Sequence, residues 1–144
     1  MKTKMNLASK VILALDIGSV RIGLAIWRPS SQMADCLPFL KRSTLKSELS
    51  RLEKIIQDEK IESFLVGLPI TLSGNFTQST KNAEFWIETL KNSFQLPVYS
   101  YDESLSSKRA LELLKDQSSA KKKEKKDSLS AAIFLEDFIR DQTN

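Results

Sequence analysis

Residues 11–27, VILALDIGSVRIGLAIW, give the clearest indication of the fold. Its first half, Val11–Ile17, is rich in branched apolar residues and predicts a buried strand. Gly18 to Arg21 supply a turn, and the apolar run Ile22–Trp27 predicts a second strand. The two halves therefore predict an antiparallel β-hairpin whose first strand carries an acidic residue, Asp16, close to its end.

The rest of the chain predicts a sheet covered by helices. A third, weaker strand is expected between Gln32 and Leu40, with Pro38 favouring a sheet edge. The elements predicted after it are a helix from a cap at Ser43 or Thr44 to about Lys60, a strand at Glu62–Val66, a helix at Thr77–Phe94, a strand at Pro97–Tyr101, and helices at Ser104–Leu114 and Leu129–Arg140. This order predicts an α/β fold with a mixed five-stranded sheet, three antiparallel strands followed by parallel ones, flanked by helices. It is the order of the ribonuclease H-like fold.

The apolar faces of the two middle helices predict the core on one side of the sheet. The residues expected inward are Leu45, Leu49, Leu52, Ile55 and Ile56 in the first helix and Ala83, Trp86, Ile87, Leu90 and Phe94 in the second. Trp27 is expected in the core as well. The lone cysteine, Cys36, is expected to be a buried or half-buried apolar residue.

Length and composition predict one globular domain in 144 residues, 41% of them hydrophobic and 28% charged. We expect it to span residues 11–140, with a flexible N-terminal extension at 1–10 and a C-terminal tail at 141–144. The apolar stretches are too short to span a bilayer, so a cytoplasmic protein without a membrane partner is expected. A formal charge of +4 favours an anionic partner. The absence of histidine excludes Ser-His-Asp and Cys-His catalysis and His-ligated zinc.

Four carboxylates lie where a site can form, namely Asp16, Asp102, Glu103 and Asp127. Each has a structural interpretation, because aspartates cap turns and acidic residues stabilise helix N-termini; for Asp102 this interpretation is preferred. The functional interpretation is that Asp16, Glu103 and Asp127 converge at one edge of the sheet. Converging carboxylates repel one another unless cations neutralise them, and Mg²⁺ or Mn²⁺ suits oxygen ligands. Two such ions can hydrolyse a phosphodiester bond without histidine.

Four motifs, in order, resemble those of the YqgF family, also called RuvX. They are DIGSVRIG at residues 16–23, Gly67-Leu68-Pro69 with Gly74, YDESLSS at residues 101–107, and the basic run Lys121 to Lys126 with Asp127 and Ala131-Ala132. The family contains proteins described as Holliday junction resolvases and as the nuclease that matures the 5′ end of small-subunit (16S) ribosomal RNA precursors. The resemblance, over about Val11 to Ile139, implies a hydrolase of ester bonds. It implies Asp16, Glu103 and Asp127 as the catalytic and metal-binding triad, with Arg21 on a phosphate. Ser104 stands where the family has arginine, which removes a cation from the expected grip on substrate.

Further contacts with nucleic acid are predicted from Asn75, in the polar loop Leu68–Gln78, and from Lys121, Lys122, Lys123, Lys125 and Lys126. The expected partner is precursor ribosomal RNA, bound by a ribosome-associated protein, or branched DNA. Junction resolution would require a homodimer, whereas RNA trimming can use a monomer. Two other classes stay open: a catalytically silent nucleic-acid-binding module and a nucleotide-binding phosphotransferase fragment. The chain is too short for the two lobes of the latter and lacks a Walker-type phosphate loop.

Overall fold

A mixed five-stranded sheet forms the centre of the protein. The computed structural model describes residues 6–69, 77–102 and 119–143, with the side chains of the last range described for 128–142. The strands are β1 (Ile12–Ile17), β2 (Arg21–Arg28), β3 (Met33–Lys41), β4 (Ser63–Leu68) and β5 (Val98–Asp102), in the order β3-β2-β1-β4-β5. The pairs β1–β2 and β2–β3 are antiparallel, whereas β1–β4 and β4–β5 are parallel. The predicted ribonuclease H-like sheet is therefore confirmed.

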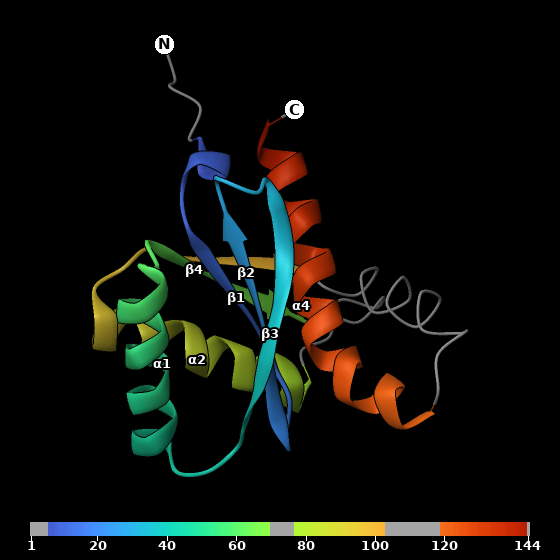
Figure 1. Ribbon diagram of the computed structural model, residues 1–144. Helices are drawn as coiled ribbons and strands as arrows, with labels where there is room; N and C mark the ends of the chain where they lie inside the picture. Colours follow the sequence, from blue (N-terminus) through green and yellow to red (C-terminus); the bar gives the residue numbers. More distant parts are fainter. Residues whose placement is uncertain (1–5, 70–76, 103–118, 144) are drawn as a thin grey trace.

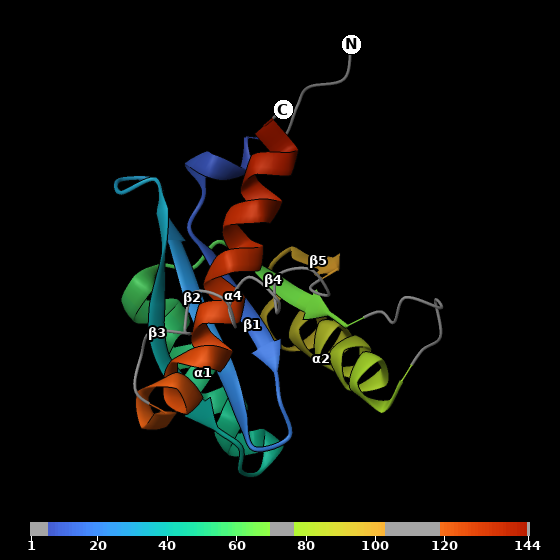
Figure 2. The same ribbon diagram turned by 90° about the vertical axis from the view of Figure 1, so that its right-hand side faces the viewer.

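Helices cover both faces of this sheet. The helices α1 (Leu45–Glu59) and α2 (Gln78–Phe94) lie on one face, and α4 (Ser119–Thr143) crosses the other (Figures 1 and 2). Strand alternation divides β1 between the two layers. Leu13 and Leu15 pack towards α1 and α2, whereas Ile12 and Ala14 pack towards α4. Asp16 continues the second series and so lies on the α4 face.

Local sequence explains where α1 and α2 begin and end. The Thr44 hydroxyl accepts a hydrogen bond from the Ser47 N–H, and Thr77 forms a capping box with Thr80. The residues after the two helices, Lys60 and Gln95, adopt left-handed backbone conformations with φ of 55° and 53°. Both predicted helices are thus confirmed to within one residue at each end.

The predicted core is confirmed except at Leu45, which is exposed. Trp27 and Trp86 are buried, as are Leu52, Ala83 and Leu90. The remaining predicted inward residues of α1 and α2 are partly buried against the same cluster, except Leu45. Leu45 is 37% exposed, and Glu48 is buried in its place. The prediction was wrong there because Glu48 has a cationic partner that apolar periodicity does not reveal.

The two ends of the chain differ from expectation. Of the extension predicted as flexible over residues 1–10, residues 1–5 lie outside the described part, and Leu7–Ser9 form a 3-10 helix with Leu7 buried. The Trp27 indole N–H donates to the Ala8 carbonyl at 3.0 Å, which ties this segment to β2. The last helix is longer than the predicted Leu129–Arg140. It begins at Ser119, so that it contains the lysine run, and it continues to Thr143 through most of the predicted tail.

Cys36 is exposed, which corrects the prediction of a buried or half-buried thiol. It lies on β3, one of the two edge strands of the sheet, which has a neighbouring strand on one side only. The helix predicted over Ser104–Leu114 lies outside the described residues. In the part of the chain that the structure describes, no helix is long and apolar enough to cross a membrane.

A buried serine fastens α4 to the sheet. The Ser128 hydroxyl donates to the Leu37 carbonyl at 2.9 Å and accepts from the Leu24 N–H at 3.4 Å, joining α4 to β2 and β3. This contact lies beside a bulge in the β2–β3 pairing, between Ile22 and Leu24. Because buried backbone groups need partners, the hydroxyl stabilises the sheet where its ladder is irregular.

We expect Ser128→Ala to lower the free energy of unfolding by roughly 2 kcal/mol, because it leaves buried polar groups without their partner. Urea unfolding of the variant would measure this loss. The matched control is Ser31→Ala, since Ser31 is exposed in the β2–β3 turn; its effect should stay within about 0.5 kcal/mol. Equal stabilities for the two variants would show that the Ser128 bridge contributes little.

Candidate active site

Asp16 lies near the end of β1, half-buried, on the face of the sheet that α4 covers. Its register partner on β2 is Gly23, which is buried. Arg21 begins β2 two residues earlier, and strand alternation therefore places it on the same face as Gly23. The structure thus brings two predicted site residues, Asp16 and Arg21, to one end of one face.

The turn after Asp16 requires a glycine. The Gly18 N–H donates to the Arg21 carbonyl at 3.0 Å and closes the turn between β1 and β2. A Cβ atom on Gly18 would lie 2.5 Å from that carbonyl oxygen, closer than a side chain tolerates. The glycine therefore permits the tight turn after which β2 returns along β1 and pairs Gly23 with Asp16.

An ion pair between the half-buried Arg42 and the buried Glu48 holds this turn from the other side. The Arg42 guanidinium donates from Nη1 to the Gly18 carbonyl at 2.7 Å and from Nε to the Glu48 carboxylate at 2.8 Å. The Arg42 backbone N–H also donates to the Val20 carbonyl at 3.0 Å. Glu48 is 1% exposed and accepts a second bond from the Ser43 N–H. The Arg42 guanidinium also lies over the Trp86 ring, 5.8 Å from its centroid, so that α1, α2 and the turn meet at one cation.

The second predicted ligand, Asp127, belongs to α4 on the face that carries Asp16. It immediately precedes Ser128, which contacts Leu24, the neighbour of Gly23 on β2. At Ser128, α4 is thereby held against β2, the strand that pairs with β1 at Asp16. The Asp127 side chain itself lies outside the described side chains.

The third predicted ligand, Glu103, lies outside the described residues and follows Asp102, the last residue of β5. Asp102 pairs with Leu68 at the end of β4. Asn75 also lies outside the described residues, and of the five predicted lysines the structure describes the helical backbone but not the side chains. Among the side chains that are described, no three acidic or cysteine groups gather closely enough to hold a metal ion.

The end of β5 is joined to α4 by a tyrosine. The Tyr101 hydroxyl donates to the Asp141 carboxylate at 2.9 Å, and its ring meets the Phe138 ring edge-on at 6.0 Å. Burial, followed by the hydrogen bond and the negative charge of Asp141, raises the pKa of Tyr101 to about 12. The hydroxyl therefore stays protonated and keeps donating well above its ordinary pKa. This contact fixes the strand end that leads into Glu103.

The sequence reasoning missed Arg42, Glu48 and Ser128. Glu48 had a visible signal, an acidic residue within the apolar stripe of a predicted helix, six positions after an arginine. Ser128 had none, because nothing local marks a hydroxyl that will meet a bulge in a distant strand pair.

The family model for RuvX, described as Holliday junction resolvase, matches residues 10–141. The chain belongs to the RuvX family. A RuvX relative from Koribacter versatilis, named "Putative pre-16S rRNA nuclease", is 38% identical over 130 residues, covering 89% of this chain and 85% of the relative. A relative of the same name from Thermoanaerobacter pseudethanolicus is 33% identical, covering 92% of this chain and 98% of the relative.

Solved structures support the fold of this RuvX protein. RuvC of Thermus thermophilus, in complex with a Holliday junction substrate, aligns with a TM-score of 0.55 at 16% identity, covering 94% of this chain and 96% of that one. The fowlpox virus Holliday junction resolvase aligns with a TM-score of 0.56 at 11% identity, covering 91% of this chain and 99% of that one. At these identities the likeness concerns the fold.

We expect Glu48→Ala to lower the free energy of unfolding by roughly 3 kcal/mol, because it leaves Arg42 without its anionic partner. The matched control, Glu53→Ala, removes an exposed carboxylate from the same helix and should change stability by less than about 0.5 kcal/mol. Chemical denaturation of both variants tests this. A Glu48 variant as stable as its control would mean that the ion pair does not hold the turn.

Proposed function

We propose that this protein is a divalent-metal-dependent nuclease that acts on the precursor of 16S ribosomal RNA in the cytoplasm. Its membership in RuvX, a family of nucleases, makes it a hydrolase of phosphodiester bonds in nucleic acid. The observation that carries the proposal is Asp16, half-buried near a strand end on the face covered by α4, in a family motif. The names of the relatives support the RNA substrate.

The donor chemistry fits a hard divalent cation. The three proposed ligands, Asp16, Glu103 and Asp127, offer carboxylate oxygens, which Mg²⁺ and Mn²⁺ prefer. When bound, such ions supply an activated water and stabilise the leaving oxygen of the cleaved phosphodiester. Asp16 suits this role because a residue on a paired central strand is held rigidly and needs little reorganisation.

The other proposed residues bind and orient the substrate. Arg21 presents a planar guanidinium with several N–H donors, the geometry that binds a phosphate by two parallel hydrogen bonds. Lys121, Lys122, Lys123, Lys125 and Lys126 neutralise phosphates farther along the chain of the nucleic acid, and Asn75 contacts its sugar-phosphate backbone. These contacts recognise shape and charge rather than base sequence, as expected for structured RNA.

Resolution of branched DNA is the second candidate function. The description of the family model as Holliday junction resolvase favours it. It would require two copies of the chain, because a four-way junction is cut on two strands. A monomer associated with the ribosome suffices for trimming a precursor RNA.

The purified protein should be offered a precursor 16S RNA fragment and a synthetic four-way DNA junction, each with Mg²⁺ and with Mn²⁺. Cleavage of the RNA and not of the junction supports the proposal. Cleavage of the junction alone supports the second candidate, and cleavage of neither by folded protein overturns both.

Asp16→Asn should abolish cleavage while leaving the fold and most of the binding to nucleic acid intact. The amide keeps the size of the side chain but removes the charge that holds a cation, and the loss of a repelling charge costs the metal-free fold little. The matched control is Asp58→Asn, an exposed aspartate on α1, which should cleave like the wild type. Cleavage, binding and thermal melting should be measured on one preparation of each variant. Activity of Asp16→Asn within a few-fold of the wild type would contradict the mechanism.

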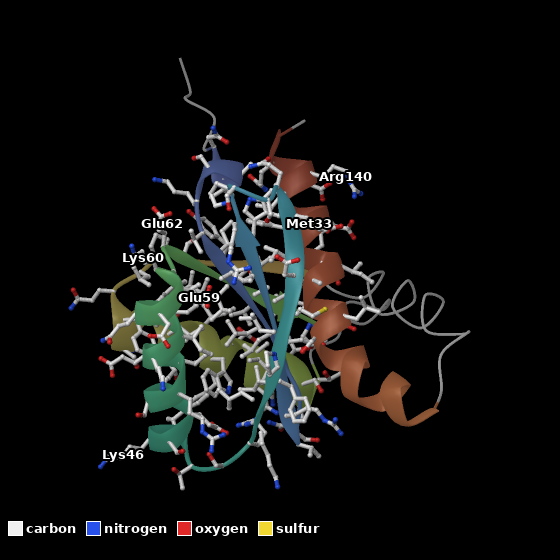
Figure 3. All side chains as sticks on the ribbon, in the orientation of Figure 1. Met33, Lys46, Glu59, Lys60, Glu62 and Arg140 are labelled. Carbon is white, nitrogen blue, oxygen red and sulfur yellow. The ribbon has the colours of Figure 1, made fainter. Side chains whose placement is uncertain are left out.

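Replacing Lys122, Lys123, Lys125 and Lys126 by alanine should weaken binding and flatten its dependence on salt. Each lost phosphate contact lowers the slope of log affinity against log salt by roughly 0.7 to 0.9. The control removes the same charge by replacing Lys46, Lys54, Lys81 and Lys91, which are exposed on α1 and α2; Lys46 is seen at the start of α1, away from α4 (Figure 3). Binding titrations with nucleic acid at several salt concentrations give the slope for each of the two variants. Equal slopes for the two variants would remove the lysine run from the binding surface.

A further inference from the structure

A half-exposed aromatic ring lies under the arginine that we assign to substrate phosphate. Phe39 on β3 is 37% exposed, and the Arg21 guanidinium carbon lies 4.9 Å from the centre of its ring. At this distance a guanidinium is attracted by the negative face of the ring. Phe39 was not among the residues predicted to form the site.

The bulge in the β2–β3 pairing brings Phe39 to this position. Ile22 pairs with Leu40 and Leu24 pairs with Leu37, so that two residues of β3, Pro38 and Phe39, stand opposite Gly23. An extra residue of this kind re-aims the side chains beside it. The bulge therefore determines which residue of the edge strand meets Arg21.

Gly23 connects this ring to the proposed metal ligand. It is the register partner of Asp16 on one side and stands opposite Phe39 on the other. The residue of β2 that lies between Asp16 and Phe39 thus carries no side chain. The aromatic ring, the guanidinium and the carboxylate belong to three neighbouring strands at one end of the sheet.

We propose that Phe39 is a positioning residue that holds the guanidinium of Arg21 for the substrate phosphate. The proposal rests on the proposed function, because it assigns Arg21 to a phosphate. An arginine side chain gives up much rotamer freedom when it binds, and a guanidinium already stacked on a ring gives up less. Stacking engages the flat face of the guanidinium, so the ring orients the side chain without competing with a phosphate for its N–H groups.

The positive charge around Arg21 and Phe39 also favours a phosphate ligand. Lys41 is the register partner of Arg21 on β3 and is exposed, so a second cation stands at this end of the sheet. Two cations beside a half-exposed ring suit a nucleic-acid backbone, which presents closely spaced phosphates. Phe39 acts on this ligand through Arg21, which distinguishes it from an aromatic residue that stacks on a base.

A double-mutant cycle between Phe39 and Arg21 tests the proposal. The variants are Phe39→Leu, Arg21→Gln and their combination, with Phe39→Tyr as the conservative variant. Phe85→Leu is the matched control, because Phe85 is 53% exposed on α2, on the other side of the sheet. The readouts are the Kd for a fluorescent precursor RNA fragment in EDTA, and kcat and KM for its cleavage with Mg²⁺.

We expect Phe39→Leu to weaken binding about two- to five-fold, the range of a cation–π contact near a surface. Phe39→Tyr and Phe85→Leu should bind like the wild type. The double variant should bind no more weakly than Arg21→Gln alone. In the cleavage assay, the loss of kcat/KM in Phe39→Leu should divide between kcat and KM in the same ratio as the larger loss in Arg21→Gln.

Losses that multiply in the double variant would overturn the proposal, because Phe39 would then contact the RNA independently of Arg21. Wild-type binding by Phe39→Leu would overturn it too. Thermal melting checks the fold, and Phe39→Met offers a second apolar replacement. Because binding is measured without metal, the cycle measures the coupling between Phe39 and Arg21 even if the protein cleaves no RNA. Failure of this proposal can therefore be distinguished from failure of the proposed function.

Discussion

The ion pair between Arg42 and the buried Glu48 links helix α1 to the turn that follows Asp16. A carboxylate that is 1% exposed is costly to bury, and it is tolerated because the guanidinium and the Ser43 N–H donate to it. The same guanidinium donates to the Gly18 carbonyl in the turn after Asp16. The same guanidinium therefore compensates the buried carboxylate of α1 and holds the turn after Asp16 in place.

A second set of polar contacts attaches α4 to the opposite face of the sheet. Ser128 fastens α4 at a bulge between β2 and β3, and Tyr101 fastens the end of β5 to Asp141 at the far end of the same helix. The helix thus contacts all five strands and has a polar anchor near each end of its described side chains. Such anchors supply direction, which the apolar contacts beneath α4 do not, because hydrophobic burial is non-directional. The polar contacts determine how the helix that contains Asp127 lies across the strand end that contains Asp16.

The bulge itself has a further consequence for the site. A regular ladder would set one residue of β3 against Gly23, whereas the observed pairing sets two against it. The extra residue places a ring beneath Arg21 and leaves an irregular stretch of backbone that the Ser128 hydroxyl satisfies. One irregularity in strand pairing therefore contributes both to the attachment of α4 and to the surroundings of the proposed phosphate-binding arginine.

The hairpin at residues 11–27, the alternation of helices and strands after it and the caps of α1 and α2 are predictable from the sequence, because they depend on local periodicity and on short-range hydrogen bonds. Its motifs also predict Asp16 and Arg21 as site residues. Three features follow from the packed fold: Glu48 is buried while Leu45 is exposed, Cys36 is exposed on an edge strand, and Phe39 rather than a neighbour contacts Arg21. Each of these depends on a partner from another element or on the register of two strands. The local sequence pattern predicts neither the partner nor the register, because residues distant in sequence become neighbours only when the sheet and its helices have packed.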